Sequence, residues 1–151
     1  MDVSPAGAGS IQINQTAVAS YPADSTFASG MSVSLEAVPA LGYHFDSWEG
    51  DLSGTTNPAS ISMTCNKRVI ARFSRTMHAV TIRVKGGGST TPAAGVYSYA
   101  EGTVLDITAT PGRGWLFDSW IGGVSNSKSA KITLTIEDDK NLIANFSQKV
   151  H

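Results

Sequence analysis

The chain has 151 residues, with 11 Lys and Arg against 12 Asp and Glu, which gives a formal net charge of -1 at pH 7. Without a basic face, nucleic acid and anionic membrane surfaces are poor candidates as partners. Cys65 is the single cysteine, so an intramolecular disulfide and a Cys-rich zinc site are excluded. No apolar run approaches the ~20 residues of a membrane helix, so we expect no membrane insertion.

The first forty residues read as short strands separated by turns. After a Gly- and Ala-rich turn at residues 6–10, residues 11–13 alternate apolar and polar side chains, which is typical of a half-buried strand. Pro22 marks a loop or a sheet edge, because proline cannot donate to a ladder. A longer alternating run predicts a second strand over residues 32–38, which ends at Pro39.

Residues 42–50, Gly-Tyr-His-Phe-Asp-Ser-Trp-Glu-Gly, form the segment around which the chain is organised. Tyr43 and Phe45 share one face of a strand. Trp48 lies three positions after Phe45 and in a regular strand would face the other way. We therefore predict a bulge or sharp bend at Ser47 that turns Trp48 back into the core.

Two further strands complete the first half of the chain. They are predicted over residues 61–63 and 69–73, after a polar loop, and the second of them ends at Phe73.

The same series of elements returns in the second half. Residues 114–122 read Gly-Trp-Leu-Phe-Asp-Ser-Trp-Ile-Gly, seventy-two positions after the first copy. The equivalents of Tyr43, Phe45, Trp48 and Phe73 are Trp115, Phe117, Trp120 and Phe146, and a second bend is predicted at Ser119.

A repeat at this period indicates two modules, residues 1–75 and 76–151. No stretch shows sustained apolar spacing of three and four, so both modules are predicted to be all-β with little or no helix. The first module begins partway into its opening strand, and the chain ends where a third unit would start, so we expect a slice of a longer tandem array.

Few residues offer catalytic chemistry. His44 is a candidate acid or base, but Leu116 stands at its place in the second copy, so we expect a surface histidine. Cys65 precedes two cationic residues but has no counterpart in the second copy, so we expect an incidental thiol. Residues 86–88, Gly-Gly-Gly, read as a turn and not as a phosphate loop, because neither Lys-Ser/Thr nor a helix follows.

Asp46 and Asp118 are the one acidic position present in both copies. Each lacks a second carboxylate at ligand spacing, so we expect both to cap the bends by accepting hydrogen bonds from nearby backbone N–H groups. Glu49, Asp51 and Asn57 are a candidate Ca²⁺ loop in the first copy only. We therefore predict no metal site and no cofactor.

The repeated segment and its flanking strands resemble the divergent internalin-type B-repeat of bacterial surface and secreted proteins. The second copy is similar to that pattern over residues 80–146, and the first copy over residues 30–73. The resemblance implies a β-grasp-like module of five or six short strands, strung in tandem as a stalk or spacer. It also implies an extracellular or cell-surface location, without catalytic residues.

Three functional classes stay open. The modules are spacers, or they bind a glycan or another surface protein through aromatic side chains outside the core, or they are accessory domains of an exported enzyme. Tyr21 and Tyr97 are the candidate ligand-facing residues for a binding role. The junction at residues 74–77 lacks Pro and Gly-rich sequence, so we expect limited bending there and a small contact between neighbouring units made by Met77 or its neighbours.

Overall fold

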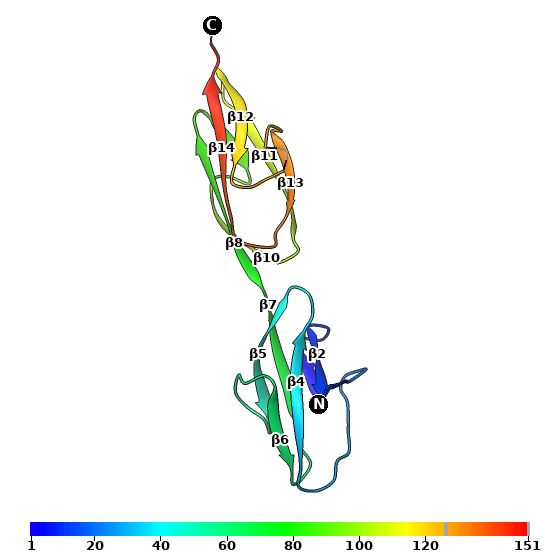
Figure 1. Ribbon diagram of the computed structural model, residues 1–151. Helices are drawn as coiled ribbons and strands as arrows, with labels where there is room; N and C mark the ends of the chain where they lie inside the picture. Colours follow the sequence, from blue (N-terminus) through cyan, green and yellow to red (C-terminus); the bar gives the residue numbers. More distant parts are fainter. Residues whose placement is uncertain (126, 151) are drawn as a thin grey trace. The chain divides into compact units, whose positions relative to one another are not determined.

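A computed structural model describes residues 1–125 and 127–150, and all regular structure in these ranges is β-strand (Figure 1). The all-β prediction is therefore confirmed. The chain divides into two compact units, Met1–Thr76 and Met77–His151. Among the described residues there is no helix long and apolar enough to cross a membrane.

Within the described residues each unit contains seven strands, which is more than the predicted five or six. The strands of the first unit are β1 (Asp2–Ser4), β2 (Gly9–Ile13), β3 (Thr16–Ala17), β4 (Met31–Pro39), β5 (Tyr43–Gly50), β6 (Ala59–Met63) and β7 (Val69–Arg75). The strands of the second unit are β8 (Met77–Lys85), β9 (Gly88–Thr91), β10 (Gly95–Ala100), β11 (Val104–Pro111), β12 (Trp115–Ile121), β13 (Lys131–Thr135) and β14 (Lys140–Gln148).

The strands of each unit form two sheets that enclose one core. In the first unit the strand orders are β1-β7-β5 and β3-β2-β4-β6, and in the second unit they are β10-β8-β14-β12 and β13-β11-β9. The buried side chains of each core come from both of its sheets. Since the apolar residues alternate along the strands, each sheet turns one face inward.

The first and last strands of each unit lie side by side and parallel. β1 pairs with β7, and β8 pairs with β14, whereas the other strand pairs are antiparallel. Each unit therefore begins and ends within the same sheet.

The two units differ in the pairing of their third strand. In the second unit β10 pairs with β8, but in the first unit β3 pairs with β2 in the opposite sheet. A two-residue turn connects β2 to β3, and both of its residues, Asn14 and Gln15, have positive φ. A two-residue turn of this kind forms a tight hairpin, so β3 pairs antiparallel with β2. The longer segment of the first unit then returns to the residue before β1, and the Ala23 N–H donates to the Met1 carbonyl at 2.8 Å.

The predicted bulge is confirmed in both units. The register between β5 and β7 pairs Phe45 with Phe73 and then Ser47 with Arg72, so the extra residue is Asp46. The register between β12 and β14 shifts in the same way across Asp118. The bulged residue therefore lies one position before the serine at which the bend was predicted.

Candidate functional site

The tryptophan of each repeated segment lies inside the core of its unit. Trp48 and Trp120 are only 2% and 3% exposed. The bulge reverses the face of the strand for every residue after it, which is why these side chains point inward. Neither ring is available to a ligand on the surface.

The polar atoms of both tryptophans are satisfied by the loop that follows the strand. The indole Nε1–H of Trp48 donates to the Thr56 carbonyl at 2.9 Å, and that of Trp120 donates to the Ser129 carbonyl at 3.1 Å. The backbone N–H of Trp48 donates to the Gly54 carbonyl oxygen at 2.8 Å. A buried indole needs such a partner, and these bonds also fix the path of the loop.

Two phenylalanines complete an aromatic cluster in each unit. The ring of Phe45 lies 5.2 Å from Trp48 and 5.9 Å from Phe73, centroid to centroid. The equivalent distances from Phe117 are 5.8 Å to Trp120 and 5.8 Å to Phe146. Tilted and edge-on pairs at these distances are favourable. The aromatic residues of the repeated segment therefore pack on one another.

The remaining aromatic position of the segment lies at the edge of each core. Trp115 and Tyr43 are both half-buried. The Arg75 guanidinium stacks over the Tyr43 ring at 5.6 Å from its centroid. The Trp115 ring covers the turn at residues 86–88, because a Cβ added to Gly87 would lie 2.2 Å from the indole Nε1. The glycine run thus provides room for Trp115, in agreement with a turn and not a phosphate loop.

The predicted capping role of Asp46 and Asp118 is wrong. Asp46 accepts a hydrogen bond from the Ser74 hydroxyl and pairs with His44 Nε2 at 3.1 Å. Asp118 accepts from the Asn145 side chain at 3.2 Å. At the bulge, each carboxylate points away from the core and so contacts side chains of the adjacent last strand instead of nearby backbone N–H groups.

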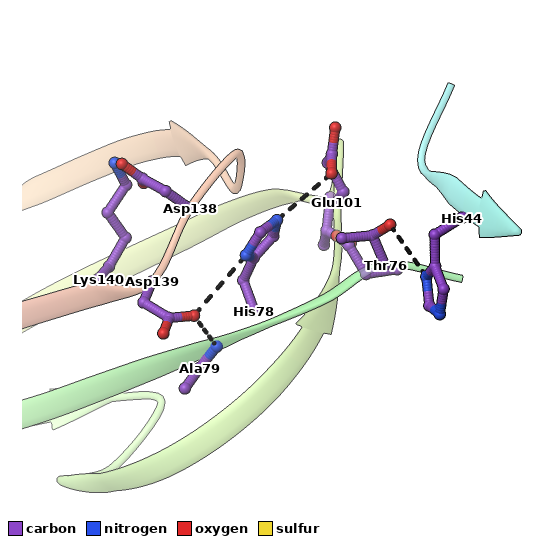
Figure 2. Close-up of polar contacts among 10 residues, drawn as sticks. His44, Thr76, His78, Ala79, Glu101, Asp138, Asp139 and Lys140 are labelled. Atoms are coloured by element: carbon purple, nitrogen blue, oxygen red, sulfur yellow. Dashed lines mark hydrogen bonds and ion pairs between the residues drawn. The ribbon is translucent and has the colours of Figure 1, made fainter. Parts of the chain in front are cut away.

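Ser74, Asp46 and His44 lie close together, but the serine does not contact the imidazole as nucleophilic catalysis requires. The Ser74 hydroxyl donates to Asp46. Among the described residues, the Ser74 hydroxyl makes no hydrogen bond to His44. His44 Nδ1 lies 3.5 Å from the Thr76 hydroxyl, and its side chain is 54% exposed (Figure 2). A nucleophile must contact the base directly, so the arrangement is that of a surface histidine.

The candidate Ca²⁺ ligands of the first unit are directed to different partners. Glu49 pairs with the Arg72 guanidinium at 3.0 Å, and Asp51 accepts from the Arg68 backbone N–H at 2.7 Å. Asn57 exchanges two hydrogen bonds with the backbone of Ala37. The structure therefore does not bring these three side chains together as ligands.

Cys65 lies in the loop between β6 and β7 and is exposed. A shallow hollow beside it is lined by Ser25, Phe27, Met63 and neighbouring loop residues. None of the lining residues is a His, Lys or Arg that could stabilise the thiolate.

Tyr21 holds the long segment of the first unit against β2. Its hydroxyl accepts a hydrogen bond from the Ile11 N–H and donates to the Ile11 carbonyl at 3.1 Å. Burial raises the pKa of the Tyr21 hydroxyl, against the smaller opposing effect of the backbone hydrogen bond from Ile11. The ring packs against the core of its unit, so Tyr21 stabilises the longer segment.

Tyr97 lies on the edge strand β10. Its hydroxyl donates to the Ala93 carbonyl at 2.7 Å, and its ring lies 6.2 Å from that of Tyr99, with 33° between the planes. Both rings are half-buried against the core of the second unit.

A polar cluster at the start of β8 was not predicted. The His78 side chain, 18% exposed, places Nε2 3.4 Å from Glu101 and Nδ1 3.7 Å from Asp139 (Figure 2). Asp139 also accepts a hydrogen bond from the Ala79 N–H at 2.8 Å. The sequence signal was the acidic turn before β14, which is informative only once β8 and β14 are known to be neighbours. No group of three or more His, Cys, Asp or Glu in the described ranges could hold a metal ion.

The sequence matches the family described as the divergent InlB B-repeat domain twice, over residues 3–77 and over residues 78–150. The chain therefore belongs to that family, as the resemblance of the repeated segment implied. Neither a curated protein nor a solved structure matches it. A tandem pair of such domains fits a structural repeat of surface proteins.

Proposed function

We propose that the chain is a non-catalytic spacer of a secreted or cell-surface bacterial protein, which holds other domains away from the cell. The main support for this proposal is that the aromatic side chains of the repeated segment form the core of each unit. In both units its tryptophan is buried and hydrogen-bonded, and its phenylalanine packs on two other rings. A segment duplicated for binding would be expected to keep these rings accessible.

The surface groups support the same proposal. The position of His44 in the first unit is occupied by Leu116 in the second, and the carboxylates of Asp46 and Asp118 have different partners. Residues that perform one reaction in both units would need the same neighbours. The aromatic residues that the two units share are those that build the core.

Surface display tests the spacer role. The chain is inserted between a bacterial membrane anchor and an epitope, and antibody labelling of intact cells is compared with an epitope fused directly to the anchor. We expect stronger labelling with the two units present, because folded domains separate the epitope from the surface polysaccharide. Equal labelling would contradict the proposal.

A carbohydrate-binding role is the second candidate, and the pair of rings on β10 favours it. Tyr97 and Tyr99 offer neighbouring, half-exposed faces on an edge strand, and aromatic faces stack on the apolar faces of sugars. A glycan array probed with the chain, with Tyr97→Ala as the control variant, separates the two candidates. A glycan that binds the chain and is lost in the variant would replace the spacer by a binding module.

A further inference from the structure

The parallel pair of terminal strands gives each unit a defined response to tension. The chain enters the second unit at the start of β8 and leaves it at the end of β14. Six registered residue pairs, from Val80 with Lys140 to Lys85 with Asn145, connect these strands. Because the strands are parallel, the entry and the exit lie at opposite ends of the pair.

We propose that the units are load-bearing, with the parallel terminal strands acting as a mechanical clamp. The inference rests on the proposed function, since a spacer is under tension whenever the domains it carries are held. A pull on the two ends of a unit slides one strand along the other and loads all the hydrogen bonds between them at once. In an antiparallel terminal pair the same pull would open the bonds one after another.

The clamp strands of the second unit are protected on both sides. β8 lies between β10 and β14, and β14 lies between β8 and β12 (Figure 1). Val80, Ile82 and Leu142 on these strands are at most 1% exposed. Because side chains alternate between faces, sliding by one residue would turn this buried set outward. Sliding therefore has to break the core as well as the ladder.

Force enters the second unit at the start of β8, and side-chain contacts stabilise this end of the strand. Asp139, in the turn before β14, accepts from the Ala79 N–H of β8, and His78 lies between Asp139 and Glu101 (Figure 2). These contacts connect the first residues of β8 to the beginning of β14. These contacts add to the set of interactions between β8 and β14 that must break at the same time.

The clamp of the first unit is smaller. β1 and β7 share three registered pairs, from Asp2 with Ile70 to Ser4 with Arg72, and β1 is at the edge of its sheet. Val3 is the one buried hydrophobic residue of β1. The first unit should therefore unfold at a lower force than the second.

Force spectroscopy on the whole chain tests the clamp, with the pulling direction as the variable. With handles at the two termini, both units are sheared, and each unfolding event should release roughly 25 nm of chain, at about 3.6 Å per residue. With handles at the N-terminus and Cys65, the force acts at the starting ends of β1 and β7 and peels them apart. Cys65 is exposed and is the single cysteine, so the attachment needs no substitution.

We expect the first unit to unfold at about half the force or less when it is peeled than when it is sheared, because bonds loaded one at a time break sooner. In the end-to-end pull, Asp139→Ala should lower the force of the stronger event alone, which assigns that event to the second unit. Equal forces in the two directions would overturn the clamp and leave the spacer proposal standing. Loss of the spacer role in the display experiment would not change these forces.

Discussion

At the scale of single residues, the enclosed aromatic side chains of the two units have the same neighbours, whereas their exposed side chains have different partners. Trp48 and Trp120 have equivalent neighbours and equivalent hydrogen-bond acceptors in the following loop. His44 and Leu116, at equivalent exposed positions, share no chemistry. The constraint on the repeated segment is therefore burial.

Asp139 is the residue whose side chain most directly connects β8 to the turn before β14. Asp139→Ala removes the acceptor of the Ala79 N–H and the neighbour of His78. We expect a loss of about 1–2 kcal/mol in the free energy of unfolding of the second unit, measured by chemical denaturation. Asp139→Asn keeps an acceptor oxygen and should lose less than half of that. A larger loss for Asn than for Ala would refute the role of the hydrogen bond.

Tyr21 should make the stability of the first unit depend on alkaline pH. Burial raises the pKa of its hydroxyl in the folded state, so the neutral form is favoured by folding. Its contribution is complete below the unfolded pKa of about 10 and is lost as the pH rises through the folded pKa. Tyr21→Phe should therefore be less stable than the natural chain at pH 8, with a difference that shrinks above pH 10. A difference that is constant with pH would show that the hydroxyl is irrelevant.

At the scale of elements, the bulge is the feature that the sequence predicted most clearly. The spacing between Phe45 and Trp48 cannot place both rings in one core on a regular strand, and the same spacing in the second copy repeats the requirement. The pairing of β3 could not be predicted in this way. Thr16 and Ala17 carry no alternation, and their sheet is chosen by the positive φ of Asn14 and Gln15.

Deletion of Asp118 tests the bulge directly. Without the extra residue, β12 becomes regular and Trp120 faces away from its core. We expect the second unit to lose cooperative unfolding, as measured by near-UV circular dichroism. Asp118→Ala keeps the residue count and removes one exposed hydrogen bond to Asn145, so it should cost about 1 kcal/mol or less. A second unit that still unfolds cooperatively in the deletion variant would contradict the account.

The glycine that ends the repeated segment is required for close approach between strands. Gly122 has a φ of 128°, and a Cβ there would lie 1.9 Å from the Asn141 carbonyl oxygen. Gly122→Ala should therefore destabilise the second unit by more than about 3 kcal/mol, since strain and a backbone clash add. Gly114, with a φ of 82° and open space around it, is the matched control. Gly114→Ala should cost about 1–2 kcal/mol in the same denaturation experiment.

At the scale of the whole molecule, the chain consists of two compact units with a core each. The repeat period predicted two modules, because two closely similar aromatic motifs seventy-two residues apart indicate a duplicated unit. The all-β fold was predicted from the alternation of apolar and polar residues. The division of each unit into two sheets, and the cluster around His78, depend on which distant strands become neighbours, and local sequence carries no signal for that choice.

The central claim is that both copies of the aromatic segment serve as core. Exchange of the indole N–H protons, followed by NMR with ¹⁵N-labelled tryptophan, measures this for both units in one sample. Trp48 and Trp120 should exchange slowly, with protection factors above roughly 10³, because exchange requires opening of the core. Trp115, half-exposed on its glycine turn, should exchange far faster and serves as the internal control. Exchange of Trp48 or Trp120 at the rate of Trp115 would contradict the claim.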